Sequence, residues 1–126
     1  MIKKLTAAEE ELMKYLWEIG PSYFSDIKEK YSDPKPATST INTLIKRLID
    51  KGYIKYKLYG NSRRYYAIVK KEKYFSTHIK GLISNYFNNS IEQFASFFSR
   101  EIEISNDDLK KLRQMVDEKI KTDNDG

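Results

Sequence analysis

Hydrophobic residues recur at the spacing of a helical face in three segments of the first 52 residues. The first segment follows Thr6-Ala7-Ala8-Glu9, a capping box in which the Thr hydroxyl and the Glu carboxylate each satisfy a free backbone N–H. Its apolar positions are Leu12, Met13, Leu16, Trp17 and Ile19. Gly20-Pro21 ends the segment. We therefore predict a helix that ends before Gly20 and has one buried face, and we assign Trp17 to the core.

The second and third segments are separated by Ser32-Asp33-Pro34-Lys35-Pro36, which the interior of a helix cannot contain. A short helix is predicted to start at Ser22 and to carry Asp26 in its first turn. A third helix is predicted to begin near residues 37–39 and to run to about Lys51, with Gly52 as its left-handed C-terminal residue. Its inward face is Ile41, Leu44, Ile45 and Leu48, and its outward positions are Thr38, Ser39, Asn42, Thr43, Lys46 and, at the edge, Arg47.

After Gly52 the pattern changes to the alternation of a β-hairpin. Apolar residues alternate with Lys55 and Lys57 in one strand, and residues 65–69 supply the partner strand. Gly60-Asn61 is expected to provide the positive φ of the turn. Three helices followed by a hairpin predict a winged helix-turn-helix.

The rest of the chain returns to helical spacing. We predict one helix over residues 70–87, a break at Asn88-Asn89-Ser90, a second helix over residues 91–98 and a last helix after the capping signature Ser105-Asn106-Asp107-Asp108. Residues 122–126 are expected to be frayed. The predicted fold is mainly α with a small β-hairpin: a winged helix-turn-helix domain over residues 1–70, a three-helix dimerisation domain over 71–122 and a disordered tail over 123–126.

These three helices carry more apolar surface than they can cover among themselves. They can fold back on the winged domain, or they can bury this surface against a second copy of the chain, which we favour. Burial yields roughly 25 cal/mol per Å², so an interface of obligate size would hold two protomers together. The candidate interface residues are Tyr74, Phe75, Tyr86, Phe87, Phe94, Phe97, Phe98, Leu112, Met115 and Val116.

The charge of the chain is unevenly distributed. The net charge is +5, but residues 1–74 hold 16 basic and 9 acidic side chains, whereas residues 75–126 hold 7 basic and 9 acidic ones. Between Pro36 and Lys73 there are ten Lys or Arg and only two acids. A basic front half predicts that a polyanion is bound there; the alternative is that surplus lysine only aids solubility.

The outward residues of the third helix are suited to double-stranded DNA. The first four are short donors and acceptors that can meet base edges: an Asn fits adenine, and a Thr methyl fits the thymine methyl group. Lys46 and Arg47 lie a turn later and are expected to reach phosphates or a guanine. One of Thr38 and Ser39 is equally expected to be the helix cap.

The predicted wing supplies a second group of DNA-binding candidates. These residues are Lys55, Asn61, Ser62, Arg63 and Arg64. Because side chains alternate along a strand, only one of the two arginines can point at DNA in a regular hairpin. We favour Arg63, with Asn61 and Ser62 at the tip.

Other function classes find little support in the sequence. There is no cysteine and one histidine, His78, so we expect no metal site, no cofactor and no catalytic residues. The acidic clusters at residues 9–11 and 107–108 fit the first turns of helices. No apolar run approaches the length of a membrane span, and we expect a cytoplasmic protein. The main alternative is a winged-helix module that binds protein or RNA, since the fold alone does not establish DNA binding.

Several of these segments resemble the penicillinase-repressor family, often called BlaI/MecI. The resemblance lies in Leu5-Thr6-x-Ala8-Glu9-x-x-Leu12-Met13-x-x-Leu16-Trp17, in Thr40-Ile41-x-Thr43-Leu44-Ile45-x-Arg47-Leu48 and in Lys51-Gly52-Tyr53-Ile54. It continues through the hairpin turn Tyr59-Gly60-Asn61 and, more weakly, Leu109-x-x-Leu112-Arg113. It therefore covers essentially the whole chain.

The resemblance implies a homodimeric repressor that binds a palindromic operator through its winged part and dimerises through its last three helices. It also implies a membrane-bound sensor protease system that triggers cleavage of the repressor. The region that matches the cleaved segment is near Phe97-Phe98, where the Asn that precedes the family's scissile bond is absent. The related copper-responsive repressors have a Cys-rich tail, and this chain has no cysteine.

Overall fold

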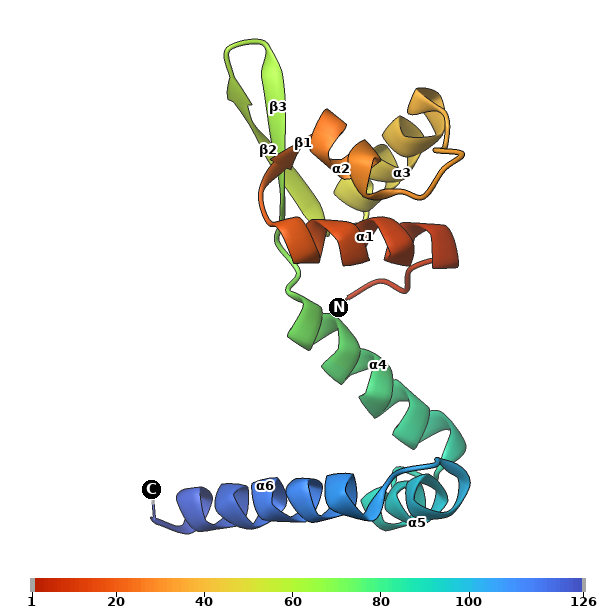
Figure 1. The fold of residues 1–126 in the computed structure, drawn as a ribbon, viewed down its shortest axis with the longest axis vertical. Helices are drawn as coiled ribbons and strands as arrows, with labels where there is room; N and C mark the ends of the chain where they lie inside the picture. Colours follow the sequence, from red (N-terminus) through yellow and green to blue (C-terminus); the bar gives the residue numbers. More distant parts are fainter. Residues whose placement is uncertain (1, 126) are drawn as a thin grey trace. The chain divides into compact units, whose positions relative to one another are not determined.

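The computed structural model describes residues 2–125, which divide between Ile79 and Lys80 into two compact units. These described residues form six helices and a small three-stranded antiparallel sheet (Figure 1). This confirms a mainly α fold with a winged-helix N-terminal part and a helical C-terminal part. The division between the units falls inside helix α4 (Lys71–Tyr86) rather than before it.

The N-terminal unit has the order of a winged helix. Its elements are α1 (Ala7–Ile19), β1 (Ser22–Tyr23), α2 (Phe24–Lys30), α3 (Thr38–Asp50), β2 (Ile54–Tyr59) and β3 (Ser62–Ala67). The capping box at the start of α1 is confirmed: the Thr6 hydroxyl accepts from the Glu9 N–H, and the Glu9 carboxylate accepts from the Thr6 N–H. Gly52 has φ 82°, as predicted for the residue that follows α3.

The segment between α1 and α2 differs from the prediction. Ser22 does not start a helix; it lies in β1 opposite Tyr65 of β3, and its buried hydroxyl donates to the Gly20 carbonyl at 2.5 Å. Helix α2 begins two residues later, where the Asp26 carboxylate accepts from the Tyr23 N–H at 3.0 Å. The pairing with β3 is remote in sequence, so the local capping pattern could not reveal it.

The hairpin turn has glycine at its first central position. Strands β2 and β3 pair from Ile54–Ala67 to Tyr59–Ser62, which leaves Gly60 and Asn61 as the two-residue turn. Only Gly60 has positive φ, at 63°, so the expectation for Asn61 was wrong. A two-residue hairpin turn with positive φ only at its first central residue is of the II′ kind. The order of the sheet is β1-β3-β2.

The core of the N-terminal unit is formed where the three helices meet the base of the hairpin. The predicted inward residues of α3 are all buried. The core residues are Leu5, Leu12, Met13, Leu16, Ile27, Tyr31, Ile41, Leu44, Ile45, Leu48, Tyr53, Ile54, Tyr65 and Tyr74. The outer half of the hairpin projects beyond this core, as the 63% exposure of the Leu58 side chain shows.

The C-terminal unit contains the end of α4, α5 (Ile91–Glu101) and α6 (Asn106–Asp125). The predicted break is present: Asn88 and Asn89 have φ near 55°, and the Ser90 hydroxyl caps α5 by accepting from the Gln93 N–H. Helix α6 continues to Asp125, past the residue at which fraying was expected to begin; Gly126 lies outside the described residues. Within residues 2–125, none of the helices has the length and apolar character needed to cross a membrane.

Candidate nucleic-acid interface

The outward face of α3 is polar and exposed over its whole length. All six residues predicted to point away from the core are exposed, whereas the four inward residues are buried. The side chains exposed along this face are Thr38, Ser39, Asn42, Thr43, Lys46 and Arg47. The 3.6-residue periodicity was sufficient to assign these positions because α3 packs on α1 and β2 along one side only.

Neither Thr38 nor Ser39 caps α3. The cap residue is Ala37, which makes no side-chain hydrogen bond to the first turn. Free N–H groups therefore remain at this end of the helix. The Thr38 hydroxyl instead accepts from Lys28 Nζ at 3.1 Å. Lys28 of α2 thus lies at the start of the exposed face, a position that the sequence did not reveal because ten residues separate it from Thr38.

The Thr43 hydroxyl is already engaged inside the helix. It donates to the Ser39 carbonyl at 2.9 Å, one turn earlier. Its proton is therefore occupied, while its methyl group and an oxygen lone pair stay available. Asn42 beside it makes no side-chain hydrogen bond within the described residues, so both its donor and its acceptor are free.

The two wing arginines lie on opposite faces of the hairpin. Arg63 pairs with Leu58 and shares the face of the buried Tyr65, which is the face toward the start of α2. Its guanidinium lies 4.5 Å from the centre of the Tyr56 ring. Arg64 pairs with Lys57 on the other face. The alternation argument was therefore right that one strand directs its two arginines to different sides.

A second set of cations occupies the face of Arg64. Lys55 and Lys57 point to this side, because Lys55 pairs with Tyr66 and Lys57 with Arg64. The Arg64 guanidinium is 5.8 Å from the Tyr59 ring centre, and Lys57 Nζ is 5.9 Å from that of Tyr66. Stacking on tyrosine holds these charges on the hairpin without neutralising them.

The wing tip and the first turn of α3 project to the same side of the N-terminal unit, at the top of the view in Figure 1. Between the tip and the start of α2 there is an open cleft of about 630 Å³. Arg63, Asn61 and Ser62 line it from the hairpin, and Ser25 and Asp26 line it from α2. The cleft therefore lies between the wing and α2 and carries Arg63 and Asp26, while the exposed face of α3 lies outside it.

An ion pair ties the end of α3 to α1. Lys51 Nζ lies 2.5 Å from a carboxylate oxygen of Glu9, which is 1% exposed. Burial alone would raise the pKa of Glu9, but hydrogen bonds from Lys51 and Thr6 outweigh it, and the pKa lies below its ordinary value. Tyr53, just after α3, donates its hydroxyl to the Lys3 carbonyl. These contacts fix the angle at which α3 presents its outward face.

Tyr74, predicted at a dimer interface, is buried in the N-terminal unit instead. Its hydroxyl donates to the Glu10 carboxylate at 2.6 Å, and its ring lies 5.6 Å from that of Trp17 and 6.0 Å from that of Tyr53. Burial, and then this carboxylate, raise the pKa of Tyr74 well above its ordinary value. The prediction is wrong for this residue because helical spacing shows that one face of α4 is buried but not which segment of the protein covers that face.

The C-terminal unit exposes many large apolar side chains. Neither α5 nor α6 contains a buried residue, although Phe87 packs against Phe94 and Phe97 at centroid distances of 5.5 and 5.2 Å. The large apolar residues exposed here are Leu82, Tyr86, Ile91, Phe97, Ile102, Leu109, Leu112, Met115, Val116 and Ile120. An unpartnered strip of this length on a water-exposed helix marks an interaction surface.

Comparison with known proteins gives a consistent picture over nearly the whole chain. The family model described as penicillinase repressor matches residues 5–118. The methicillin resistance regulatory protein MecI of Staphylococcus aureus strain N315 is 26% identical over 117 residues, which cover 92% of this chain and 95% of that protein. The penicillinase repressor of Bacillus licheniformis is 23% identical over 118 residues, covering 93% and 92%. An uncharacterised 16.5 kDa protein of Latilactobacillus sakei is 25% identical over 120 residues, covering 94% and 82%.

Proposed function

This chain belongs to the penicillinase repressor family of transcriptional regulators, and from this premise we propose that it represses transcription by binding double-stranded DNA as a homodimer. The observation that carries the proposal is that an exposed polar face of α3, with Lys46 and Arg47, and a basic wing project to the same side of one compact unit. An α-helix fits the major groove, where the pattern of donors and acceptors distinguishes all four base pairs. We place the protein in the cytoplasm, where it has access to chromosomal DNA.

In the proposed complex, α3 lies in the major groove and reads bases with Asn42 and Thr43. Asn42 has an unengaged donor and acceptor, which suits a bidentate contact with adenine. Thr43 offers a methyl group to thymine, since its proton is already donated to Ser39. Lys46 and Arg47 follow a turn later, in reach of phosphates or a guanine. Lys28 and the uncapped N–H groups of α3 supply phosphate contacts at the front of the helix.

The wing is proposed to lie along the adjacent minor groove. This groove is about 6 Å wide, so a hairpin placed there has a phosphate backbone on each side. Arg63, with Asn61 and Ser62 at the tip, then faces one strand of the DNA, while Lys55 and Arg64 face the other. Because the two faces of the wing would each lie beside a phosphate backbone, both Arg63 and Arg64 can contact DNA in this arrangement.

Dimerisation is proposed to occur through the C-terminal helices. The residues proposed there are Phe75, Tyr86, Phe87, Phe94, Phe97, Phe98, Leu112, Met115 and Val116. A second copy would cover the apolar strip of α6, and the resulting two-fold axis would require a palindromic operator with half-sites about one helical turn apart. Two copies also double the number of phosphate contacts, and with them the dependence of affinity on salt.

Family membership also supports induction by a membrane-bound sensor protease system that cuts near Phe97 and Phe98. Both lie inside α5, so cleavage would require local unwinding. Mass spectrometry of the repressor from induced cells would identify the cut. An intact chain in induced cells that have lost repression would contradict this proposal.

The decisive experiment measures binding to duplex DNA at several salt concentrations. We expect the affinity for a random 30-base-pair duplex to fall steeply with salt, and selection from a randomised pool to recover a palindrome. The same titration with the paired substitution Lys55→Ala and Arg63→Ala should give a shallower slope, by about one unit for each lost phosphate contact. An affinity that does not change with salt would instead favour the alternative, a winged-helix module for protein partners.

A further inference from the structure

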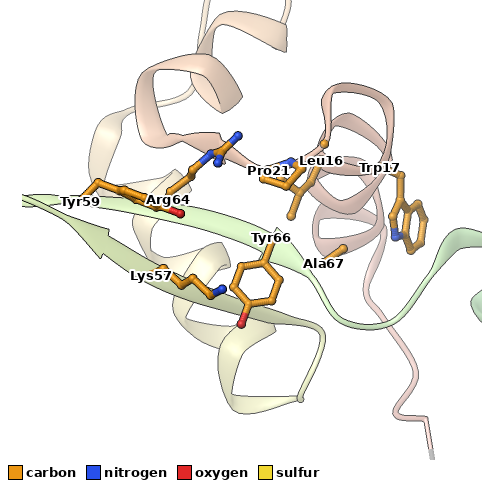
Figure 2. Close-up of a pocket in the computed structure, with 9 residues that line it drawn as sticks. Leu16, Trp17, Pro21, Lys57, Tyr59, Arg64, Tyr66 and Ala67 are labelled. Carbon is orange, nitrogen blue, oxygen red and sulfur yellow. The ribbon is translucent and has the colours of Figure 1, made fainter.

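A second concave site of the N-terminal unit lies away from the cleft of Arg63. It is a cleft of about 440 Å³ between the C-terminal end of α1 and the hairpin face that carries Lys57 and Arg64 (Figure 2). This volume is within the range of sites that hold small organic molecules. All its lining residues belong to the same compact unit.

One side of the cleft is apolar and rigid. Leu16, Trp17 and Pro21 come from α1 and the turn that follows it, and Ala67 comes from the end of β3 (Figure 2). The Trp17 indole N–H donates to the Val69 carbonyl at 2.9 Å, which fixes the orientation of the ring. A wall of this kind is suited to the apolar body of a ligand.

The other side of the cleft combines cations with aromatic rings. Lys57 and Arg64 lie opposite each other on neighbouring strands, and Tyr59 and Tyr66 flank them (Figure 2). None of the described residues that line the cleft is acidic. Within residues 2–125, neither cation forms a salt bridge. Two uncompensated positive charges at the edge of an apolar wall favour a ligand that has an anionic head and an aromatic body.

We propose that this cleft binds a small aromatic carboxylate. The carboxylate pairs with the Arg64 guanidinium and with Lys57 Nζ, and the aromatic body lies against Trp17 and Pro21. An isolated inorganic anion would leave the apolar wall unused, and a neutral aromatic compound would leave both cations unpaired. The cleft is therefore expected to bind most tightly a molecule that has both an anionic group and an aromatic body.

Occupancy of the cleft has a consequence for DNA binding, and this step rests on the proposed function. Lys57 and Arg64 lie on the wing face that we assign to one phosphate backbone. A ligand that holds both cations removes them from the DNA contact. Each lost phosphate contact corresponds to about eightfold in affinity near 0.1 M salt, and a dimer with both clefts occupied loses at least two of them. The cleft would then act as an effector site through direct competition for charge.

Trp17 is the only tryptophan of the chain and lines this cleft, so its fluorescence can report binding there. Because Trp17 also borders a second pocket with Lys71 and Phe75, the arginine variants described below identify which site is occupied. The full-length protein, without DNA, is titrated with 3-phenylpropionate, with the neutral 3-phenylpropanamide and with acetate, using excitation at 295 nm. We expect a saturable change below about 1 mM for 3-phenylpropionate, at least about tenfold weaker binding of the amide and no saturation with acetate.

Adjacent arginines provide a matched pair of variants. Arg64→Ala should weaken the binding of 3-phenylpropionate by about tenfold or more, whereas Arg63→Ala, on the other face of the strand, should change it less than about twofold. Lys57→Ala is the second test variant, and circular dichroism checks that each variant is folded. Equal affinities for acid and amide, equal effects of the two arginine variants or no saturable change would each overturn the site.

The coupling is measured separately, as DNA affinity with and without saturating 3-phenylpropionate. A fall of at least about fiftyfold in wild type, where each of the two protomers loses a phosphate contact, and none in Arg64→Ala supports competition for charge; an unchanged affinity in wild type overturns it. A protein that binds the carboxylate but no DNA refutes the proposed function while the cleft assignment stands. The two failures are therefore distinguishable.

Discussion

Lys51, at the C-terminal end of α3, forms a 2.5 Å ion pair with the buried carboxylate of Glu9 in the first turn of α1. The same carboxylate accepts the backbone N–H of Thr6 in the capping box. One buried group therefore links the start of the first helix to the end of the helix that we propose reads DNA. The pair is 42 residues apart in sequence, and it sets the orientation of α3 relative to α1.

Replacing Lys51 with Met should destabilise the protein substantially. Removal of one partner leaves the Glu9 charge buried and unpaired, which costs about 2–4 kcal/mol once the partial exposure of Lys51 is taken into account. Urea unfolding at pH 7 and fixed protein concentration measures this loss. The control is Lys119→Met, which breaks the exposed pair with Asp123 and should change stability by less than about 0.5 kcal/mol. Equal losses in the two variants would contradict the role of the buried pair.

The same pair predicts a specific dependence on pH. The pKa of Glu9 is lowered in the folded state, so its contribution to stability is present above the ordinary carboxyl pKa of 4.5 and is lost as pH falls through the folded value. In Lys51→Met, burial is no longer outweighed and raises the pKa, so protonation of Glu9 relieves the unpaired charge. The difference in unfolding free energy between wild type and Lys51→Met should therefore shrink between pH 7 and pH 4. A difference that stays constant over this range would refute the assignment.

Asn42 and Lys55 should differ in the kind of DNA binding that they support. Asn42→Ala should reduce discrimination at one operator base pair by about 1–3 kcal/mol, because a base contact is lost. Lys55→Ala should weaken binding to all sequences alike and lower the salt slope of the dimer by about two units, because each protomer loses one phosphate contact. Binding to the selected operator, its single-base variants and random duplex separates the two effects. The same effect of both substitutions on all duplexes would count against the placement of α3 in the groove.

Substitutions of Gly52 should show how much the left-handed backbone conformation at the end of α3 requires glycine. Its φ is 82°, and a Cβ atom at this position would meet nothing within 4 Å, so the cost of substitution comes from the backbone conformation alone. We expect Gly52→Ala to destabilise the protein by about 1–2 kcal/mol and Gly52→Asn to cost less, since Asn tolerates the left-handed region better. Thermal unfolding of the two variants measures the difference. A cost for Gly52→Asn as large as that for Gly52→Ala would contradict this explanation by backbone conformation.

The apolar strip of α6 should control the oligomeric state. Leu112 is 45% exposed, and Leu112→Asp places a charge in the proposed dimer interface. Sedimentation equilibrium should show a dimer in wild type and at least about a hundredfold weaker association in the variant, since burying an unpaired carboxylate costs several kcal/mol. Gln114→Asp introduces the same residue on a different side of the helix and should leave the dimer unchanged. A monomeric wild type, or loss of the dimer in both variants, would exclude this interface.

Much of the N-terminal unit could be predicted because its signals are local. The capping box of Thr6 and Glu9, the periodicity of α3 and the glycine after it each depend on a few neighbouring residues and on backbone stereochemistry. The exposed set on α3 follows from the same periodicity. The hairpin follows from alternation around Gly60-Asn61, and alternation alone separates Arg63 from Arg64.

Tertiary structure decided the features that depend on remote partners. Ser22 lies in a strand because β3 pairs with it. Tyr74 is buried because it donates a hydrogen bond to Glu10 and packs against Trp17. Lys28 of α2 contacts α3 through its hydrogen bond to Thr38. The cleft of Trp17 and Arg64 likewise exists only once α1 and the hairpin are brought together. Sequence by itself determined the six helices and the hairpin and which side of α3 is apolar, since short-range geometry sets them, whereas β1 was not predicted. Which surfaces meet is a property of packing between distant segments, and only the folded chain establishes it.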